Sequence, residues 1–187
     1  AGAVTISAPL VASTSGGAVS QTWSVDGTGT SSLNVTGNVT FGAPVRKTGA
    51  GTLTLAGTNT GSGGVTIGAG TLRLGSADAL GAGALTVGTL TTFDNSSGSA
   101  LILANNAANW NGAFTFTGTN DLSFGTGAAT LGQSLTATVT TASRVPTVGS
   151  LTDGAGSYDL TKVDDDADIC NFKCAHRILF HQNYGQP

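Results

Sequence analysis

Both cysteines and both histidines of the chain stand close together near its C-terminal end. Cys170 and Cys174 are four residues apart, and His176 and His181 follow them. On a helix, residues four apart share a face, and His181 would fall on that face as well. The spacing C-x3-C-x-H-x4-H matches no strong zinc signature, and it lacks the C-x-x-C-H that covalent haem needs. We therefore predict no metal site and no cofactor.

A disulfide is the chemistry that these two thiols favour in an oxidising compartment. Cys170 and Cys174 could bond to each other, which would strain a regular helix, or to another subunit. The alternative is a pair of reduced, buried cysteines. The sequence leaves their redox state open.

The acidic run at 164–168, Asp-Asp-Asp-Ala-Asp, invites a calcium hypothesis because calcium binds clustered carboxylates. The run lacks the glycine and the distal Glu of an EF-hand loop, and it lacks the GGxGxD pattern of calcium-binding β-rolls. We interpret it as a solvated turn whose aspartates begin a helix. That helix is predicted to run from Asp168 to about Asn183. Its apolar side would hold Ile169, Phe172, Leu179 and Phe180.

Two tryptophans could bind a glycan, because indole rings stack on sugar rings. Trp23 and Trp110 both sit beside strand-like alternation, where an aromatic residue more often fills a core. Exposed indoles would favour a glycan-binding adhesin. Buried indoles would remove the main support for that function.

Catalytic residues are not indicated, so we predict that the chain is not an enzyme. Polysaccharide cleavage needs carboxylates paired in a groove. Most aspartates before residue 163 stand where Asp serves turn geometry, and no histidine precedes the tail. Nucleophile-elbow, phosphate-loop and dinucleotide motifs are missing from the sequence. The aspartates considered are Asp26, Asp78, Asp94, Asp121, Asp153 and Asp159.

The elements that would position these residues follow from an unusual composition. Of 187 residues, 29 are Gly and only 9% are charged, against an average near ~25%. All acidic residues are Asp, and Met is absent, which indicates a removed leader or a fragment. The net charge of −3, without a basic stripe, disfavours nucleic acid as a partner. Because no apolar stretch reaches ~18 residues, we expect no membrane-spanning helix.

Apolar and polar residues alternate in short segments along the whole chain, which predicts strands with one buried face. Turns containing Gly, Asn or Asp separate the segments by mostly ~8–12 residues, which is typical of an all-β sandwich, barrel or solenoid. The segments are Val4–Ile6, Trp23–Val25, Leu33–Val35, Val39–Phe41, Leu53–Leu55, Val65–Ile67, Leu72–Leu74, Leu85–Val87, Leu101–Leu103, Phe114–Phe116, Leu122–Phe124, Leu135–Val139 and Tyr158–Leu160.

An internal repeat distinguishes among these architectures. Copies of a G-A-G-[TA]-L-x-[LV] unit begin at Gly49, Gly68 and Gly81, at an irregular spacing. A recurring unit of this kind is produced by the stacked coils of a solenoid. We therefore predict an all-β fold, a right-handed parallel β-helix (β-solenoid) with a short C-terminal helical or irregular cap.

Residues 47–75, KTGAGTLTLAGTNTGSGGVTIGAGTLRLG, resemble the autotransporter-associated β-strand repeat of passenger regions in large bacterial surface proteins. Residues 101–139 look like the segment that often follows this repeat, and the resemblance covers 20–162. It implies a secreted protein, extracellular or at the cell surface, and a scaffold rather than a pocket. The motifs are low in complexity, so they specify architecture better than function.

The chain divides into three parts. Residues 1–19 are apolar and charge-free, and they form either the first rung or a strand donated to a neighbouring subunit. The solenoid domain spans 20–162. At 163–187 the composition changes abruptly, and we interpret this tail as a capping or assembly element, since an open terminal rung exposes unpaired backbone groups.

The leading functional hypothesis is an extracellular structural protein. Its β-helical subunits would self-assemble into a surface filament or matrix, by end-to-end stacking or strand addition, so the expected partner is another copy of the chain. The alternative is an adhesin, a passenger fragment of a larger autotransporter-like protein that binds glycans or host surfaces. That alternative predicts a far longer native gene.

Overall fold

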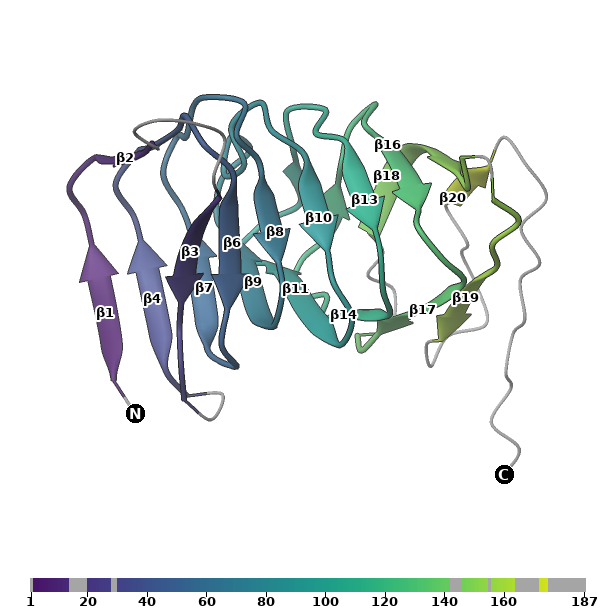
Figure 1. The fold of residues 1–187 in the computed structure, drawn as a ribbon, viewed down its shortest axis with the longest axis horizontal. Helices are drawn as coiled ribbons and strands as arrows, with labels where there is room; N and C mark the ends of the chain where they lie inside the picture. The colour runs from purple at the N-terminus through teal and green to yellow at the C-terminus, as the bar shows by residue number, and fades with distance from the viewer. Residues whose placement is uncertain are drawn as a thin grey trace.

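The chain winds into a parallel β-solenoid of about six stacked turns (Figure 1). The computed structural model describes residues 2–13, 20–27, 30–141, 146–154 and 156–163, together with the backbone of 172–174. Every strand pairing in those residues is parallel, and none of them is helical. The prediction of an all-β, parallel solenoid is confirmed.

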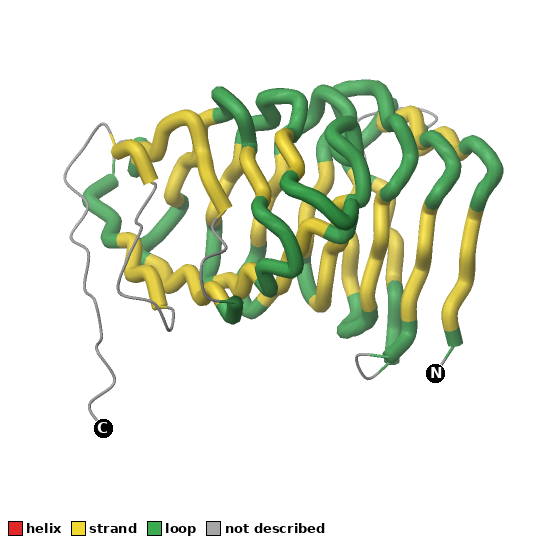
Figure 2. The backbone as a smooth tube through the Cα atoms, turned by 180° about the vertical axis from the view of Figure 1, so that it is seen from behind, coloured by secondary structure: helices red, strands yellow, loops and turns green. Residues whose placement is uncertain are grey.

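Equivalent strands of successive coils pair side by side and build the faces of the solenoid. Figure 2 shows the loops that join the strands at its corners. The first face has the order β1 (Ala3–Ile6), β4 (Ser32–Val35), β7 (Thr52–Leu55), β9 (Gly70–Leu74), β11 (Thr91–Asn95), β14 (Phe114–Phe116), β17 (Leu135–Val139) and β19 (Leu160–Val163). The second face has the order β3 (Gln21–Ser24), β6 (Val45–Thr48), β8 (Val65–Ile67), β10 (Leu85–Val87), β13 (Ala108–Trp110), β16 (Ala128–Leu131) and β18 (Pro146–Thr152). Between these two faces lie β2 (Leu10–Ala12) paired with β5 (Val39–Phe41), and β12 (Leu101–Ile102) paired with β15 (Leu122–Ser123), which also pairs with β18.

Strand register aligns apolar residues into columns inside the solenoid. Leu53 pairs with Leu72, and Leu72 pairs with Phe93. All three side chains are fully buried, and each contributes about 1.5–3 kcal/mol relative to an exposed position. The ring of Phe93 lies 5.1 Å from that of Phe114 and 5.4 Å from that of Phe116, so aromatic packing extends the core toward the C-terminal coils.

Glycine allows the corners of neighbouring coils to stack closely. Gly49 and Gly70 have φ angles of +75° and +70°, a region that residues with a Cβ rarely adopt. A Cβ on Gly70 would lie 2.5 Å from the carbonyl oxygens of Gly49 and Gly51. The glycine-rich corners are therefore a steric requirement of the coil stacking.

Buried asparagines join coils from inside the corners. Oδ1 of Asn59 accepts a hydrogen bond from the Val39 N–H at 2.7 Å, and its Nδ2 donates to the Ala79 carbonyl at 2.7 Å. One side chain thus connects three successive coils. Asn106 similarly donates from Nδ2 to two carbonyls of the coil before it, at 2.8 and 2.7 Å.

The irregular spacing of the sequence repeat has a structural cause. The first two copies end in β7 and β9, which stack on the same face. The third copy ends in β10, which pairs with β8 on the second face. The third copy therefore resembles the other two because it, too, is a glycine-containing corner followed by a strand, but it lies on a different face of the coil.

The structure corrects the expected C-terminal helix at three residues. Phe172–Cys174 form strand β20, which pairs in parallel with β18. Addition to an existing ladder supplies backbone partners, and here it outweighs the helical spacing of the apolar residues. The rest of the predicted helix, with Cys170, His176 and His181, lies outside the described residues.

Candidate functional site

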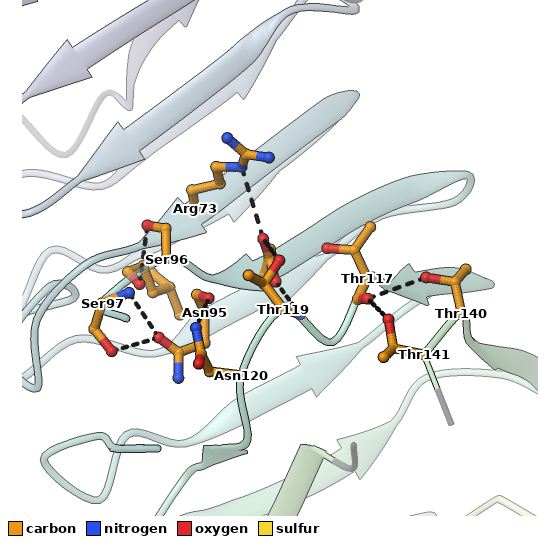
Figure 3. Close-up of polar contacts among 11 residues, drawn as sticks. Arg73, Asn95, Ser96, Ser97, Thr117, Thr119, Asn120, Thr140 and Thr141 are labelled. Carbon is orange, nitrogen blue, oxygen red and sulfur yellow. Dashed lines mark hydrogen bonds and ion pairs between the residues drawn. The ribbon is translucent and has the colours of Figure 1, made fainter. Parts of the chain in front are cut away.

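A network of polar side chains lies at the corner that follows the first face (Figure 3). The Asp94 carboxylate, in β11, is almost completely buried. It accepts hydrogen bonds from the Thr119 N–H at 3.0 Å and the Thr119 Oγ1 hydroxyl at 2.7 Å. The Nε of Arg73 lies 3.7 Å from the same carboxylate, on a side chain that is 51% exposed. The two Thr119 contacts are shorter than the contact with the half-exposed Arg73, so Thr119 is the main partner of Asp94.

Asn95 closes the loop that follows β11. Its Nδ2 donates to the carbonyls of Ser99, at 2.7 Å, and Asp121, at 2.6 Å. Its Oδ1 accepts from the Ser97 N–H at 2.9 Å and the Ser97 hydroxyl at 2.7 Å. The buried amide thus holds its own loop and bonds to the next coil.

A separate pair of hydrogen bonds lies nearby, at Thr117. The Thr117 carbonyl accepts hydrogen bonds from the hydroxyls of Thr140, at 3.1 Å, and Thr141, at 2.6 Å (Figure 3). General acid–base chemistry needs a titratable group positioned to exchange a proton with a substrate. The buried carboxylate of Asp94 is instead bonded to its neighbouring coil, so we assign this network a structural role.

Lys47 is a functional candidate that the sequence reasoning overlooked. It lies in β6 and points inward, in register with Trp23 on one side and Ile67 on the other. Its side chain is completely buried. Nζ donates to the carbonyls of Thr48 at 3.2 Å, Gly49 at 2.9 Å and Ala69 at 2.9 Å. The ammonium group therefore joins the corner of its own coil to the corner of the next.

Burial lowers the pKa of Lys47 from an ordinary value of 10.5 to about 8, and the negative charge of Asp26 opposes the shift. Desolvation disfavours the charged form, whereas a nearby carboxylate favours it. Lysines with lowered pKa values also occur in active sites. Here three backbone carbonyls accept the hydrogen bonds of the ammonium group. This indicates that Lys47 links two coils rather than acting as a nucleophile.

The strands of the first coil have a neighbour on one side only among the described residues. β1, β2 and β3 are each the terminal strand in the order of the described strands, and β1 lies at the N-terminal end of the solenoid in Figure 1. Val4 pairs with Leu33 at the head of the buried column, yet it is 58% exposed. Leu53, deeper in the same column, is fully buried. Within the described residues, Val4 is therefore the exposed first member of this column.

The two tryptophans predicted to stack on glycans differ in their burial. Trp110 is fully buried, because its register between Val87 and Leu131 points it inward. Its ring packs edge-on against Phe114, with centroids 5.0 Å apart. It therefore presents no ring face to a sugar, which corrects that expectation. Trp23 is partly buried and packs against the core.

The other predicted chemistry falls mostly in the tail. Cys170, the histidines and the acidic run 164–168 lie outside the described residues, and for Cys174 only the backbone in β20 is described. Within the described ranges, no group of three or more His, Cys, Asp or Glu side chains is placed to hold a metal ion. In those same ranges no helix has the length and apolar character to cross a membrane.

Comparison with known families gives a match. Residues 45–74 match the model of the passenger-associated-transport-repeat family. The matched segment contains β6, β7, β8 and β9, and with them Lys47 and the glycine corners. The resemblance expected from the sequence is thus confirmed for this segment, which is similar to the repeats of autotransporter passenger regions and lies within a β-solenoid. No curated protein and no solved structure was found to match the chain.

Proposed function

We propose that this chain is an extracellular structural protein, a β-solenoid scaffold subunit that joins other copies end to end. The observation that carries the proposal is Val4, which heads a buried column in the first described coil and is itself 58% exposed. A second copy stacked on this coil would cover Val4 and continue the strand ladder beyond β1.

The sequence of this end favours contact. Natural sheet edges are protected by charged residues, prolines or bulges, because an unprotected edge pairs with other chains. Strand β1 reads Ala-Val-Thr-Ile and holds neither a charged residue nor a proline; Pro9 lies after it, before β2. Strand addition would supply main-chain hydrogen bonds and apolar burial together. If the contact is heterologous and does not close into a ring, it builds a filament or matrix.

Two further observations support a structural role outside the cell. The passenger-associated repeat belongs to a class of surface-exposed regions, which supports secretion and an extracellular or surface location. The buried titratable groups Asp94 and Lys47 both hydrogen-bond to neighbouring coils. This use of buried charge supports a scaffold rather than an enzyme.

The test is the oligomeric state of the 187-residue chain and two variants, measured by light scattering across a concentration series. Val4→Lys places a charge at the head of the core column and should reduce the chain to monomers. Val11→Lys is the matched control, because Val11 is also exposed, at 67%, on the same coil but pairs with the outward Thr40. A wild type that stays monomeric at every concentration would refute the proposal.

The repeat match favours a second candidate, a passenger segment of a longer adhesin. In that case the open edge of β1 would be covered by a preceding coil of the same polypeptide. Adding the upstream coding sequence should then abolish self-association, whereas the scaffold proposal expects self-association in the native protein.

A further inference from the structure

Residues 34–40 read Asn-Val-Thr-Gly-Asn-Val-Thr, a tandem pair of Asn-X-Thr tripeptides. This tripeptide is the acceptor motif for N-linked sugars when it lies on the surface of a secreted chain. A third tripeptide of this type, Asn-Ser-Ser, occupies 95–97. The structure distinguishes sharply among the three.

Strand alternation turns the first two tripeptides outward. Val35 and Val39, their central residues, are buried in the core. The residues on either side therefore project to the outside, so each Asn and its Thr lie on the same side of the backbone. Asn38 is exposed in the turn between β4 and β5, and Thr40 is exposed in β5.

The amide of Asn38 is oriented by the next coil. Its Oδ1 accepts a hydrogen bond from the Thr58 N–H at 3.0 Å. That bond directs the oxygen toward the solenoid and the nitrogen toward the other side of the planar amide. An N-linked sugar substitutes Nδ2 and leaves Oδ1 as an acceptor, so the Thr58 bond would survive modification.

The other two asparagines are poorer acceptors. Asn95 is completely buried, and its Nδ2 is already committed to the carbonyls of Ser99 and Asp121. Asn34 is half-buried within β4, in register between Thr5 and Thr54 of the adjoining strands. Among the three, only Asn38 is exposed and lies in a turn rather than within a strand, and its one side-chain hydrogen bond uses Oδ1.

We propose that Asn38 is an acceptor site for an N-linked sugar. In the reaction, the amide nitrogen attacks the anomeric carbon of a nucleotide-activated hexose. The carbon–nitrogen bond forms, the bond from that carbon to the diphosphate oxygen breaks, and the nucleoside diphosphate leaves. The amide proton passes to a base on the transferase.

To test this proposal, the folded 187-residue chain is incubated with UDP-glucose and a soluble transferase that modifies Asn-X-Thr sequences. Peptide mass spectrometry then locates the added hexose. We expect one hexose on Asn38, higher occupancy there than on Asn34, and none on Asn95. Thr40→Val should abolish modification of Asn38 while keeping the shape of the side chain. Thr22→Val is its control, because Thr22 is an exposed threonine of another strand, β3, and belongs to no Asn-X-Thr tripeptide.

A synthetic peptide spanning 32–42 is the control for the fold, because it shows whether the enzyme accepts this sequence when it is unfolded. If the enzyme modifies the peptide and leaves Asn38 of the folded chain unmodified, the proposal is overturned. The same conclusion follows if Asn95 is modified in the folded chain at the level of Asn38, because exposure would then not govern acceptance.

Discussion

At the scale of single residues, Lys47 is the most informative side chain of the solenoid. A completely buried ammonium is costly unless its donors are satisfied, and here three carbonyls on two coils accept them. Lys47→Met would keep most of the volume but leave these carbonyls without their donor. We predict a loss of about 1–3 kcal/mol in the free energy of unfolding at pH 7.

The measurement is chemical denaturation, with Arg46→Met as the control. Arg46 is the adjacent residue of β6 and is exposed, so its replacement should change stability by no more than about 0.5 kcal/mol. Equal effects of the two substitutions would show that Lys47 has no special role in linking coils.

The stability contributed by Lys47 should also depend on pH. Its pKa is about 8 in the folded protein and 10.5 ordinarily, so the unfolded chain binds more protons between these two values. Stability rises with pH wherever the unfolded state holds more protons. We predict that the stability difference between wild type and Lys47→Met is constant below pH 8 and grows from pH 8 to 10.5. A difference that stays flat or shrinks over this window would contradict the assignment.

The sequence contained a signal for Lys47 that was not used. Val45 and Lys47 are two apart in one strand and therefore share a face, and Val45 is apolar. Reading the strand as far as Thr48 would have placed the lysine inside. The burial of Trp110 was anticipated as the alternative to glycan binding, whereas the partners of Asp94 depend on a loop 25 residues away that no local pattern reveals.

At the scale of elements, the strands were predictable where large apolar residues alternate and were missed where they do not. Leu53–Leu55 and Leu135–Val139 were expected and occur within β7 and β17. Strands β13 and β16, in contrast, read Ala-Asn-Trp and Ala-Ala-Thr-Leu. Their ladder position defines them, because each lies between strands of the coils before and after. Such tertiary override of local propensity is expected in sheets.

The corners between strands also contribute to the stability of the solenoid. Asn59 satisfies a buried N–H and a buried carbonyl on two different coils. Asn59→Ala should therefore destabilise the protein by about 1–3 kcal/mol for each backbone group left unpaired. Asn109→Ala is the matched control, since Asn109 is half-buried and makes a single 3.3 Å bond to Thr86. Denaturation midpoints compare the two, and a control as damaging as Asn59→Ala would contradict this account.

At the scale of the whole molecule, the described coils stack into a rod with apolar columns along its length, and Val4 heads one of these columns. The sequence predicted this architecture because the repeat and the strand period agree. It could not predict which core residue reaches solvent, because Val4 has the same alternating context as the buried columns. Its exposure arises only from its place at the end of the stack.

Electron microscopy of the purified chain at increasing concentration tests the central claim most directly. End-to-end joining predicts rods that exceed one solenoid in length and grow longer with concentration, in the wild type and in Val11→Lys but not in Val4→Lys. Rods of a single solenoid length at every concentration in the wild type would contradict it.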